Sequence, residues 1–295
     1  MKRTWILYGL ALCFIACTHE PPCPPSLVME GWIDADGHPV VLIHKSYVMD
    51  STHSSTKTLE ELAAEQLIPF GRVTVSDGTN EVVLTGRLDT AYMPPYTYSS
   101  LDMVGQVGKT YTVTAKYNDL YVTAKTTIPP IAYLDSMNVN TANPEKVVVT
   151  AFMSHIDPNT DAYYALFMRR YGEKQYLLCP FCVFDGKDAE NEQMEMRLYN
   201  PYGQASQLGT DTHYFNNDPN LSQQDKTFQL KLARIDYASY QFWKAYNDHL
   251  LTHGMLFVPI YKNLPGNVVD GYGNFSGMGS SFYVFSITKD TTYRY

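Results

Sequence analysis

The sequence predicts a mainly β protein. An immunoglobulin-like β-sandwich is expected over residues 26–128, and a second β-rich domain with one α-helix near residues 236–252 is expected over residues 133–290. Tyrosine accounts for 24 of the 295 residues, and tyrosine, threonine and valine favour strands. Short segments of alternating polar and apolar residues are separated by turn residues, which is typical of antiparallel sheets. The length suits two domains better than one.

The residues before the first predicted domain have the layout of a bacterial lipoprotein leader. Two basic residues open the chain, an apolar run ends at Ala16, and Cys17 comes next. The apolar run is too short to span a bilayer comfortably. We therefore expect residues 1–16 to be a signal peptide that is removed, and Cys17 to carry lipid. Residues 17–25 contain four prolines and predict a stiff, extended tether.

The charge of the chain argues against a nucleic-acid partner. The formal net charge is -8. Loss of the leader would remove two of the 22 basic residues and leave 20 against 30 acidic ones. No basic patch remains that would bind phosphates. The hydrophobic content of 45% is enough for packed cores.

The first domain is predicted to begin with a pair of strands. Residues 27–33 and 40–43 are apolar segments on either side of the turn Asp36–Gly37. A short helix is expected over residues 58–67, because leucine and alanine recur there at helical spacing.

Two hairpins complete the first domain. Residues 72–76 and 81–84 flank Asp77–Gly78, which predicts a type I′ turn because both central residues must accept positive φ. Residues 110–117 alternate cleanly between apolar and polar side chains and return as residues 120–127. Such alternation predicts one buried and one solvated face.

The second domain follows a stiff Ile-Pro-Pro linker that begins at residue 128. Its helix is predicted to start after Asp236 as N-cap and to end before Gly254. The Gly-rich segment 266–279 is expected to be a loop. Further strands are predicted at residues 136–140, 147–153, 163–171, 197–199, 227–232 and 282–288.

Cys179 and Cys182 form a Cys-Pro-Phe-Cys motif. In an exported protein this motif is readable as a local disulfide, and idle thiols are the alternative. A thioredoxin-type redox site is less favoured, because no strand–helix unit surrounds the motif. Cys23 would then be unpaired.

Two segments imitate metal sites. His249 and His253 are four residues apart on the predicted helix, a spacing that can hold zinc, but no glutamate base and no third ligand accompany them. Residues 157–161 imitate the start of a calcium loop without its glycine and its closing glutamate. We expect an ordinary helix end and an ordinary turn, and we predict no metal and no cofactor.

Aromatic residues in apparent loops are the candidates for contact with a ligand or partner. Tyr92, Tyr96 and Tyr98 surround two prolines and could stack on sugars or peptides. Tyr272 and Phe275 lie in the Gly-rich segment, where a partner-binding loop and a plain structural loop are both open. The nucleophile elbow of hydrolases is missing, so no catalytic residue is predicted.

Several segments resemble, in order along the chain, the Bacteroidetes outer-membrane lipoprotein family known as domain of unknown function 4249. The resemblance covers essentially all of the chain after the leader. The segments that carry it are residues 27–33, 73–77, 107–113, 128–136, 157–164, 235–240, 259–266 and 271–277.

The resemblance implies a lipid-anchored protein near a TonB-dependent receptor. We therefore expect a non-enzymatic accessory or binding subunit of a TonB-dependent transporter. A stand-alone glycan- or peptide-binding lipoprotein is the alternative, and an envelope hydrolase a remote one. The cell surface is favoured over the periplasmic face. Surface lipoproteins of these bacteria tend to carry several acidic residues just after the lipidated cysteine, whereas this chain has only Glu20 there.

Overall fold

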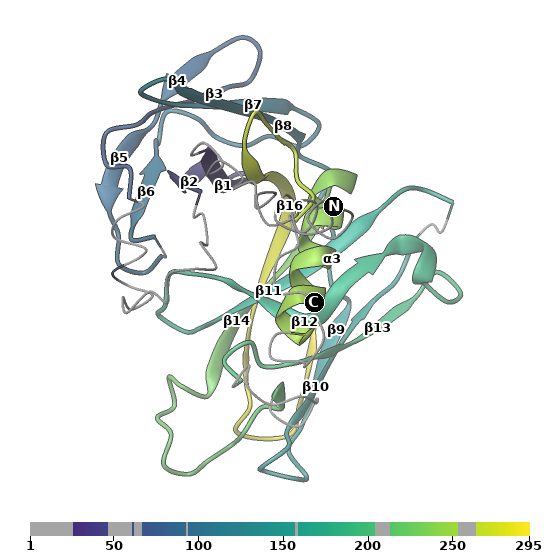
Figure 1. The fold of residues 1–295 in the computed structure, drawn as a ribbon. Coiled ribbons are helices and arrows are strands. Elements are labelled where there is room, and N and C mark those ends of the chain that lie inside the picture. The colour runs from purple at the N-terminus through teal and green to yellow at the C-terminus, as the bar shows by residue number, and fades with distance from the viewer. Residues whose placement is uncertain are drawn as a thin grey trace, which may run out of the picture.

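A computed structural model describes residues 26–46, 61, 67–92, 94–156, 159–203, 213–252 and 264–295 (Figure 1). The described part is mainly β, as predicted, and the predicted helix is present as α3 (Tyr237–Thr252). The signal peptide, the tether with Cys17 and Cys23, most of the helix predicted at residues 58–67, His253 and Asp157 lie outside the described residues.

The strands form three sheets. The eight-stranded sheet has the order β12 (Leu177–Asp185), β11 (Tyr163–Arg170), β14 (Thr227–Ile235), β16 (Tyr272–Ser286), β1 (Leu27–Asp34), β2 (Val40–Lys45), β6 (Tyr96–Ser99) and β5 (Thr85–Leu88). The five-stranded sheet has the order β15 (Val268–Val269), β8 (Leu120–Thr127), β7 (Thr110–Tyr117), β3 (Arg72–Ser76) and β4 (Glu81–Val83). The four-stranded sheet has the order β13 (Met194–Leu198), β10 (Val148–Met153), β9 (Ser136–Asn140) and β17 (Thr291–Arg294). A short 3-10 helix, η1 (Gly186–Asp188), follows β12.

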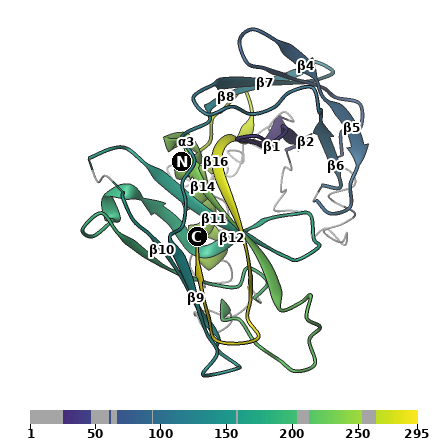
Figure 2. The ribbon, with the colours of Figure 1, turned by 180° about the vertical axis from the view of Figure 1, so that it is seen from behind.

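The two smaller sheets cover two halves of one face of the eight-stranded sheet. Alternate side chains of β16 point to this face. Phe275 joins the core with the five-stranded sheet, whereas Tyr283 and Phe285 join the core with the four-stranded sheet. In Figures 1 and 2, β16 runs as one yellow strand between the two smaller sheets. The opposite face of the large sheet packs on α3 through a third apolar cluster.

Strand β16 corrects the prediction of a Gly-rich loop. Its first half pairs in parallel with β1, with Val28 opposite Tyr272 and Asp34 opposite Met278. Its second half pairs antiparallel with β14 as far as Ser286. Residues 272–279 therefore belong to a central strand, which is hydrogen-bonded to β1 on one edge along its first half and to β14 on the other edge along its second half.

The glycines of β16 permit close approach of another segment. The Ile-Pro-Pro linker crosses the strand between the two smaller sheets. A Cβ atom on Gly277 would lie 3.0 Å from the backbone nitrogen of Ile128. A Cβ atom on Gly279 would lie 2.4 Å from the carbonyl oxygen of Pro129, a separation that real Cβ atoms do not show. Only glycine leaves room for the linker here.

The predicted hairpins are confirmed, with one correction in a turn. β3 pairs with β4, and β7 pairs with β8. The loop after β3 is not a type I′ turn, because Gly78 has positive φ but Asp77 does not. It spans four residues, and Asp77 Oδ1 accepts hydrogen bonds from the backbone N–H groups of Thr79 (3.0 Å) and Asn80 (2.7 Å). These side-chain bonds stabilise the longer loop.

The predicted cap of α3 is confirmed. Asp236 Oδ1 accepts a hydrogen bond of 2.8 Å from the backbone N–H of Ser239, which satisfies one free donor of the first turn.

The large sheet combines strands from both predicted domains, since β1, β2, β5 and β6 belong to the same sheet as β11, β12, β14 and β16. The division near residues 128–133 stays a prediction.

Candidate ligand-binding cavity

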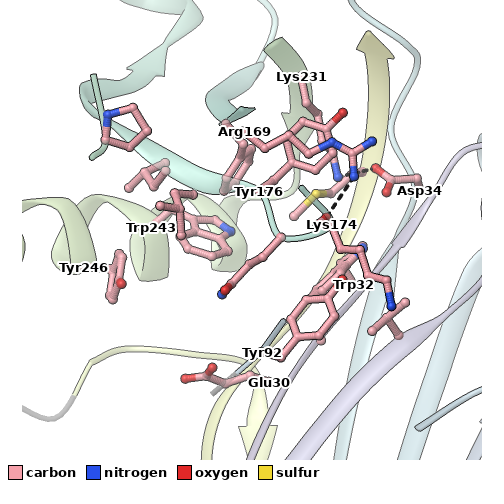
Figure 3. A pocket seen from close by; sticks show the side chains of 18 of the residues that line it. Glu30, Trp32, Asp34, Tyr92, Arg169, Lys174, Tyr176, Lys231, Trp243 and Tyr246 are labelled. Atoms are coloured by element: carbon pink, nitrogen blue, oxygen red, sulfur yellow. Dashed lines mark hydrogen bonds and ion pairs between the residues drawn. The ribbon is translucent and has the colours of Figure 1, made fainter. Parts of the chain in front are cut away.

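A cavity of about 730 Å³ lies on the face of the large sheet that carries α3 (Figure 3). Its floor consists of side chains from β1, β2, β11, β14 and β16. Helix α3 and residues 174–178 form its walls, together with Tyr92 from the loop before β6. Eight aromatic residues line it: Trp32, Tyr92, Phe167, Tyr176, Phe242, Trp243, Tyr246 and Phe282.

The alternation of β1 places functional side chains in the cavity. Met29 and Ile33 point into the apolar core with the five-stranded sheet. The intervening side chains Glu30, Trp32 and Asp34 line the cavity. The strand therefore has a core face and a cavity-facing surface, where the sequence alone suggests a core face and a solvated face.

Aromatic side chains from the helix and the sheet form two walls. The rings of Trp32 and Tyr92 have centroids 6.0 Å apart. Trp243 packs edge-to-face against Phe167 at 4.9 Å and donates its indole N–H to Ser276 Oγ at 3.3 Å. Flat aromatic surfaces of this kind bind the apolar faces of peptides and sugars.

A buried ion pair closes one end of the cavity. Lys231 is 4% exposed, and its Nζ atom lies 2.6 Å from Asp34 Oδ1. The Ser280 hydroxyl donates to the same oxygen at 2.6 Å. Phe167 and Phe282 are the cross-strand neighbours of Lys231, and their ring centroids lie 5.7 Å and 6.0 Å from its Nζ atom. Both charges are thus compensated inside the protein.

The guanidinium of Arg169 is oriented by hydrogen bonds, but no carboxylate in the described part of the chain neutralises its positive charge. Its Nε donates to Gln229 Oε1 at 2.6 Å, and its Nη1 donates to the carbonyl oxygen of Lys174 at 2.9 Å. The guanidinium lies 4.4 Å from the ring centroid of Tyr176. Among the described residues, no carboxylate forms an ion pair with Arg169. The nearby ammonium of Lys174 pairs with Asp89 at 3.2 Å.

Glu30 and Asn274 form a polar pair on the cavity floor. They are directly paired positions of the parallel strands β1 and β16. In the described part of the chain, the Glu30 carboxylate makes no hydrogen bond and no ion pair. The Glu30 side chain is exposed to the cavity. Desolvation by the surrounding protein raises the pKa of Glu30, against the opposing effect of the nearby His44.

Asn274 has an unpartnered oxygen. The side chain is 2% exposed and lines the cavity. Its Nδ2 donates to Ser276 Oγ at 2.7 Å and to Ser239 Oγ at 3.2 Å. Its Oδ1 is the one buried side-chain oxygen or nitrogen without a partner in the described structure. A buried acceptor without a donor is costly, so it marks a place for a ligand group or a water.

The aromatic candidates predicted from the sequence separate into two groups. Tyr92 lines the cavity, and its contact with a ligand stays a prediction. Tyr98 is buried instead, and its hydroxyl donates to the carbonyl oxygen of Ile68 at 2.5 Å and accepts from the backbone N–H of Gly71 at 2.9 Å. Tyr96 is half-buried beside it, and both belong to β6 rather than to a loop.

Phe275 differs from the prediction, whereas the predicted partner contact of Tyr272 stays a prediction. Phe275 is fully buried in the core with the five-stranded sheet, so it cannot contact a partner at the surface. The pleat of β16 turns it away from the cavity. Tyr272 is exposed at the beginning of the same strand and does not line the cavity.

Cys179 and Cys182 are free thiols in the structure, which is the second of the two alternatives that the sequence left open. Both lie in the core between the large and the four-stranded sheets. They belong to a bulge of β12, because Leu178 pairs with Phe167 and Val183 pairs with Ala165. Burial, with a further effect of the neighbouring Cys182, raises the pKa of the Cys179 thiol well above its usual value.

The described residues also bear on metal binding and membrane insertion. The described residues contain no group of three or more histidine, cysteine, aspartate or glutamate side chains that could hold a metal ion. No helix in the described ranges is both long enough and apolar enough to cross a bilayer.

Sequence reasoning missed most of the cavity. Glu30, Trp32, Arg169, Trp243 and Asn274 come from four different elements, and their meeting depends on sheet topology. A usable signal was present in β1, where a tryptophan stands between two acidic residues on the face opposite the core.

Comparison with known proteins gives a family and no close characterised relative. The model of a family described as Domain of unknown function (DUF4249) matches residues 18–282. No curated protein matches the chain.

Proposed function

The chain belongs to this DUF4249 family, and from this membership and the cavity we propose that it is a non-enzymatic, lipid-anchored ligand-binding protein of the outer membrane. Cys17 carries the lipid, and the body faces the cell surface. The protein acts as an accessory or binding subunit of a TonB-dependent transporter. The leader sequence, with its apolar run directly before a cysteine, supports the anchoring.

The cavity carries the binding part of the proposal. Ligand pockets occupy roughly 300–1,000 Å³ and combine apolar walls with a few polar groups that fix orientation. The cavity of about 730 Å³ has this character, with aromatic walls from Trp32 and Trp243. Three polar groups, those of Glu30, Arg169 and Asn274, retain capacity for a ligand.

The charged groups of the cavity support binding rather than hydrolysis. Acid–base hydrolysis of glycosides uses two carboxyl groups on either side of the scissile bond. Among the described residues that line the cavity, Asp34 is held by Lys231, and Glu30 is the one carboxylate without an ion pair. An envelope hydrolase is therefore the least supported alternative.

A stand-alone lipoprotein that binds glycans or peptides is the second candidate. The same cavity supports it, and the two candidates differ in the transporter partner. A membrane anchor raises the effective concentration of the protein toward a membrane partner, so weak contacts suffice for docking. This argument favours the accessory role.

The proposal also covers origin and domain organisation. The chain comes from a member of the Bacteroidetes. Residues 26–128 form an immunoglobulin-like unit and residues 133–290 a second unit, and the two share the eight-stranded sheet. The separate apolar cores under the five-stranded and four-stranded sheets support this division.

Two measurements on the full-length protein test the proposal. Affinity purification of the tagged protein from mild detergent should recover a TonB-dependent receptor, and Cys17→Ser should abolish membrane association and receptor recovery. Thermal melting with panels of oligosaccharides and short peptides should show stabilisation by at least one class of ligand. Stabilisation without a receptor would favour the stand-alone candidate. Recovery of the protein alone, with no stabilising ligand, would overturn both.

A further inference from the structure

We propose that the cavity binds short peptides with free termini. The α-amino group of the peptide binds at Glu30 and Asn274, and its α-carboxylate binds at Arg169. This inference rests on the proposed ligand-binding function and adds the chemical class of the ligand and its orientation.

The amino-group site follows from two adjacent acceptors. Glu30 and Asn274 are paired across β1 and β16, and both line the cavity. Asn274 Oδ1 has no donor, and the Glu30 carboxylate has no hydrogen-bonding partner among the described residues. An ammonium group carries three N–H donors and one positive charge. It would satisfy the buried oxygen and neutralise the carboxylate at the same time.

The carboxylate site follows from the geometry of Arg169. A guanidinium has five N–H donors, and two of them are used by Gln229 and by the Lys174 carbonyl. At least two N–H groups remain, because Tyr176 also interacts with the guanidinium through its hydroxyl and its ring. A carboxylate can accept two parallel hydrogen bonds from such a group.

The two sites lie apart, with aromatic surfaces between them. Figure 3 shows Arg169 and Glu30 at opposite ends of the labelled group, while Trp32, Tyr92 and Trp243 lie between these ends. The backbone and side chains of a bound peptide would run along these rings. A volume of about 730 Å³ leaves room for several residues.

The charges favour a peptide over a neutral glycan. The apolar faces of sugar rings could stack on the aromatic walls and the sugar hydroxyls could form hydrogen bonds, but a neutral sugar carries no charge. A neutral glycan would exclude water from the Arg169 guanidinium and from the Glu30 carboxylate without compensating either charge, which is unfavourable. A peptide with both termini free compensates both.

Retention of defined peptide mixtures on the immobilised mature protein tests the inference. The probes are a tripeptide mixture with free termini, the same mixture N-acetylated, and the same mixture C-amidated. Maltotriose serves as a neutral oligosaccharide. Bound compounds are quantified by mass spectrometry. We expect the free mixture to be retained at least tenfold more strongly than either capped mixture.

Single variants assign each terminus to its site. Glu30→Gln should abolish the discrimination against N-acetylated peptides and leave the discrimination against C-amidated ones. Arg169→Gln should have the reverse effect. Glu81→Gln and Arg72→Gln change exposed charges of the same kind on the five-stranded sheet and should change neither preference. Circular dichroism confirms that each variant is folded, and the capped probes test the inference on the wild-type protein in any case.

The possible results separate the inference from the proposed function. Equal retention of free and capped peptides, or retention of maltotriose alone, would overturn the ligand class while the binding function stands. Retention of no probe, together with no stabilising ligand in thermal melting, would overturn both. Loss of both discriminations in either single variant would overturn the assignment of termini to sites.

Discussion

The ion pair between Lys231 and Asp34 gives a sharp prediction about stability. Lys231→Met removes the ammonium but keeps an unbranched chain that packs between Phe167 and Phe282. The Asp34 carboxylate is then left with the Ser280 hydroxyl as its hydrogen-bond donor. The expected cost follows from this remaining charge rather than from lost packing.

The magnitude follows from burial. The side chains of Lys231 and Asp34 are 5% and 15% exposed. Breaking a buried pair by removing one partner costs about 3–5 kcal/mol, because an uncompensated charge stays in a poorly solvated site. Asp34→Asn should cost a similar amount, since it leaves the Lys231 ammonium among aromatic rings. The double variant leaves no charge, so its cost should be smaller than the sum of the single costs by at least about 2 kcal/mol.

Urea unfolding followed by circular dichroism measures the three free-energy differences, and the four proteins form a double-mutant cycle. Val284→Ala, on an exposed position of β16, serves as a control for packing changes in this sheet. A coupling energy below about 0.5 kcal/mol, with both single variants destabilised, would contradict the reasoning, because the two side chains would then act independently.

Three further predictions concern other parts of the fold. Gly279→Val should lower the free energy of unfolding by about 1–3 kcal/mol or more, because its Cβ would overlap the Ile-Pro-Pro linker. Its melting temperature should therefore be clearly lower than that of the control variant Val284→Ala. The pKa of Asp77 is lowered to about 2, mainly by backbone N–H groups of its own turn. Its stabilising effect is therefore full above about pH 4 and lost as the pH falls through about 2, so Asp77→Asn should weaken the pH dependence of unfolding in this window; unchanged acid unfolding would refute this. Cys179 and Cys182 should resist iodoacetamide in the native protein and react after unfolding, as peptide mapping can show, whereas a disulfide-linked peptide would contradict free thiols.

Local elements of the fold could be predicted from the sequence because local chemistry specifies them. The hairpin of β7 and β8 alternates along both strands, and Asn118 accepts the positive φ of its turn. Asp236 caps α3 through its own side chain. These features depend on residues that are close in the sequence, so the sequence pattern alone is enough to predict them.

Strand β16 could not be predicted in this way. Glycines at 271, 273, 277 and 279 are typical of a loop, because glycine is depleted in strands. Glycine is required at these positions because other backbone segments pass close to them, and this proximity is visible only in the three-dimensional structure. The parallel pairing with β1 joins residues at opposite ends of the chain, which no local pattern reveals.

Of the residues that line the cavity, one is predicted as a candidate from the sequence, Tyr92. Tyr92 stands in a proline-flanked loop, where an aromatic side chain is conspicuous. Glu30 and Arg169 belong to strands in which a polar residue opposite the core suggests contact with water. Their place in a cavity depends on α3, which covers part of this face of the sheet and contributes bulky side chains to the cavity walls.

The position of β1 has a mechanical consequence. The strand is hydrogen-bonded on both edges, to β2 on one side and to β16 on the other, over nearly its full length. Under the proposed anchoring, any tension between the bilayer and the body enters the fold at residue 26 and pulls β1 along its own axis. The hydrogen bonds on both edges then resist in shear, all at once, rather than opening one after another. A transporter could therefore pull on the docked protein without unfolding the body.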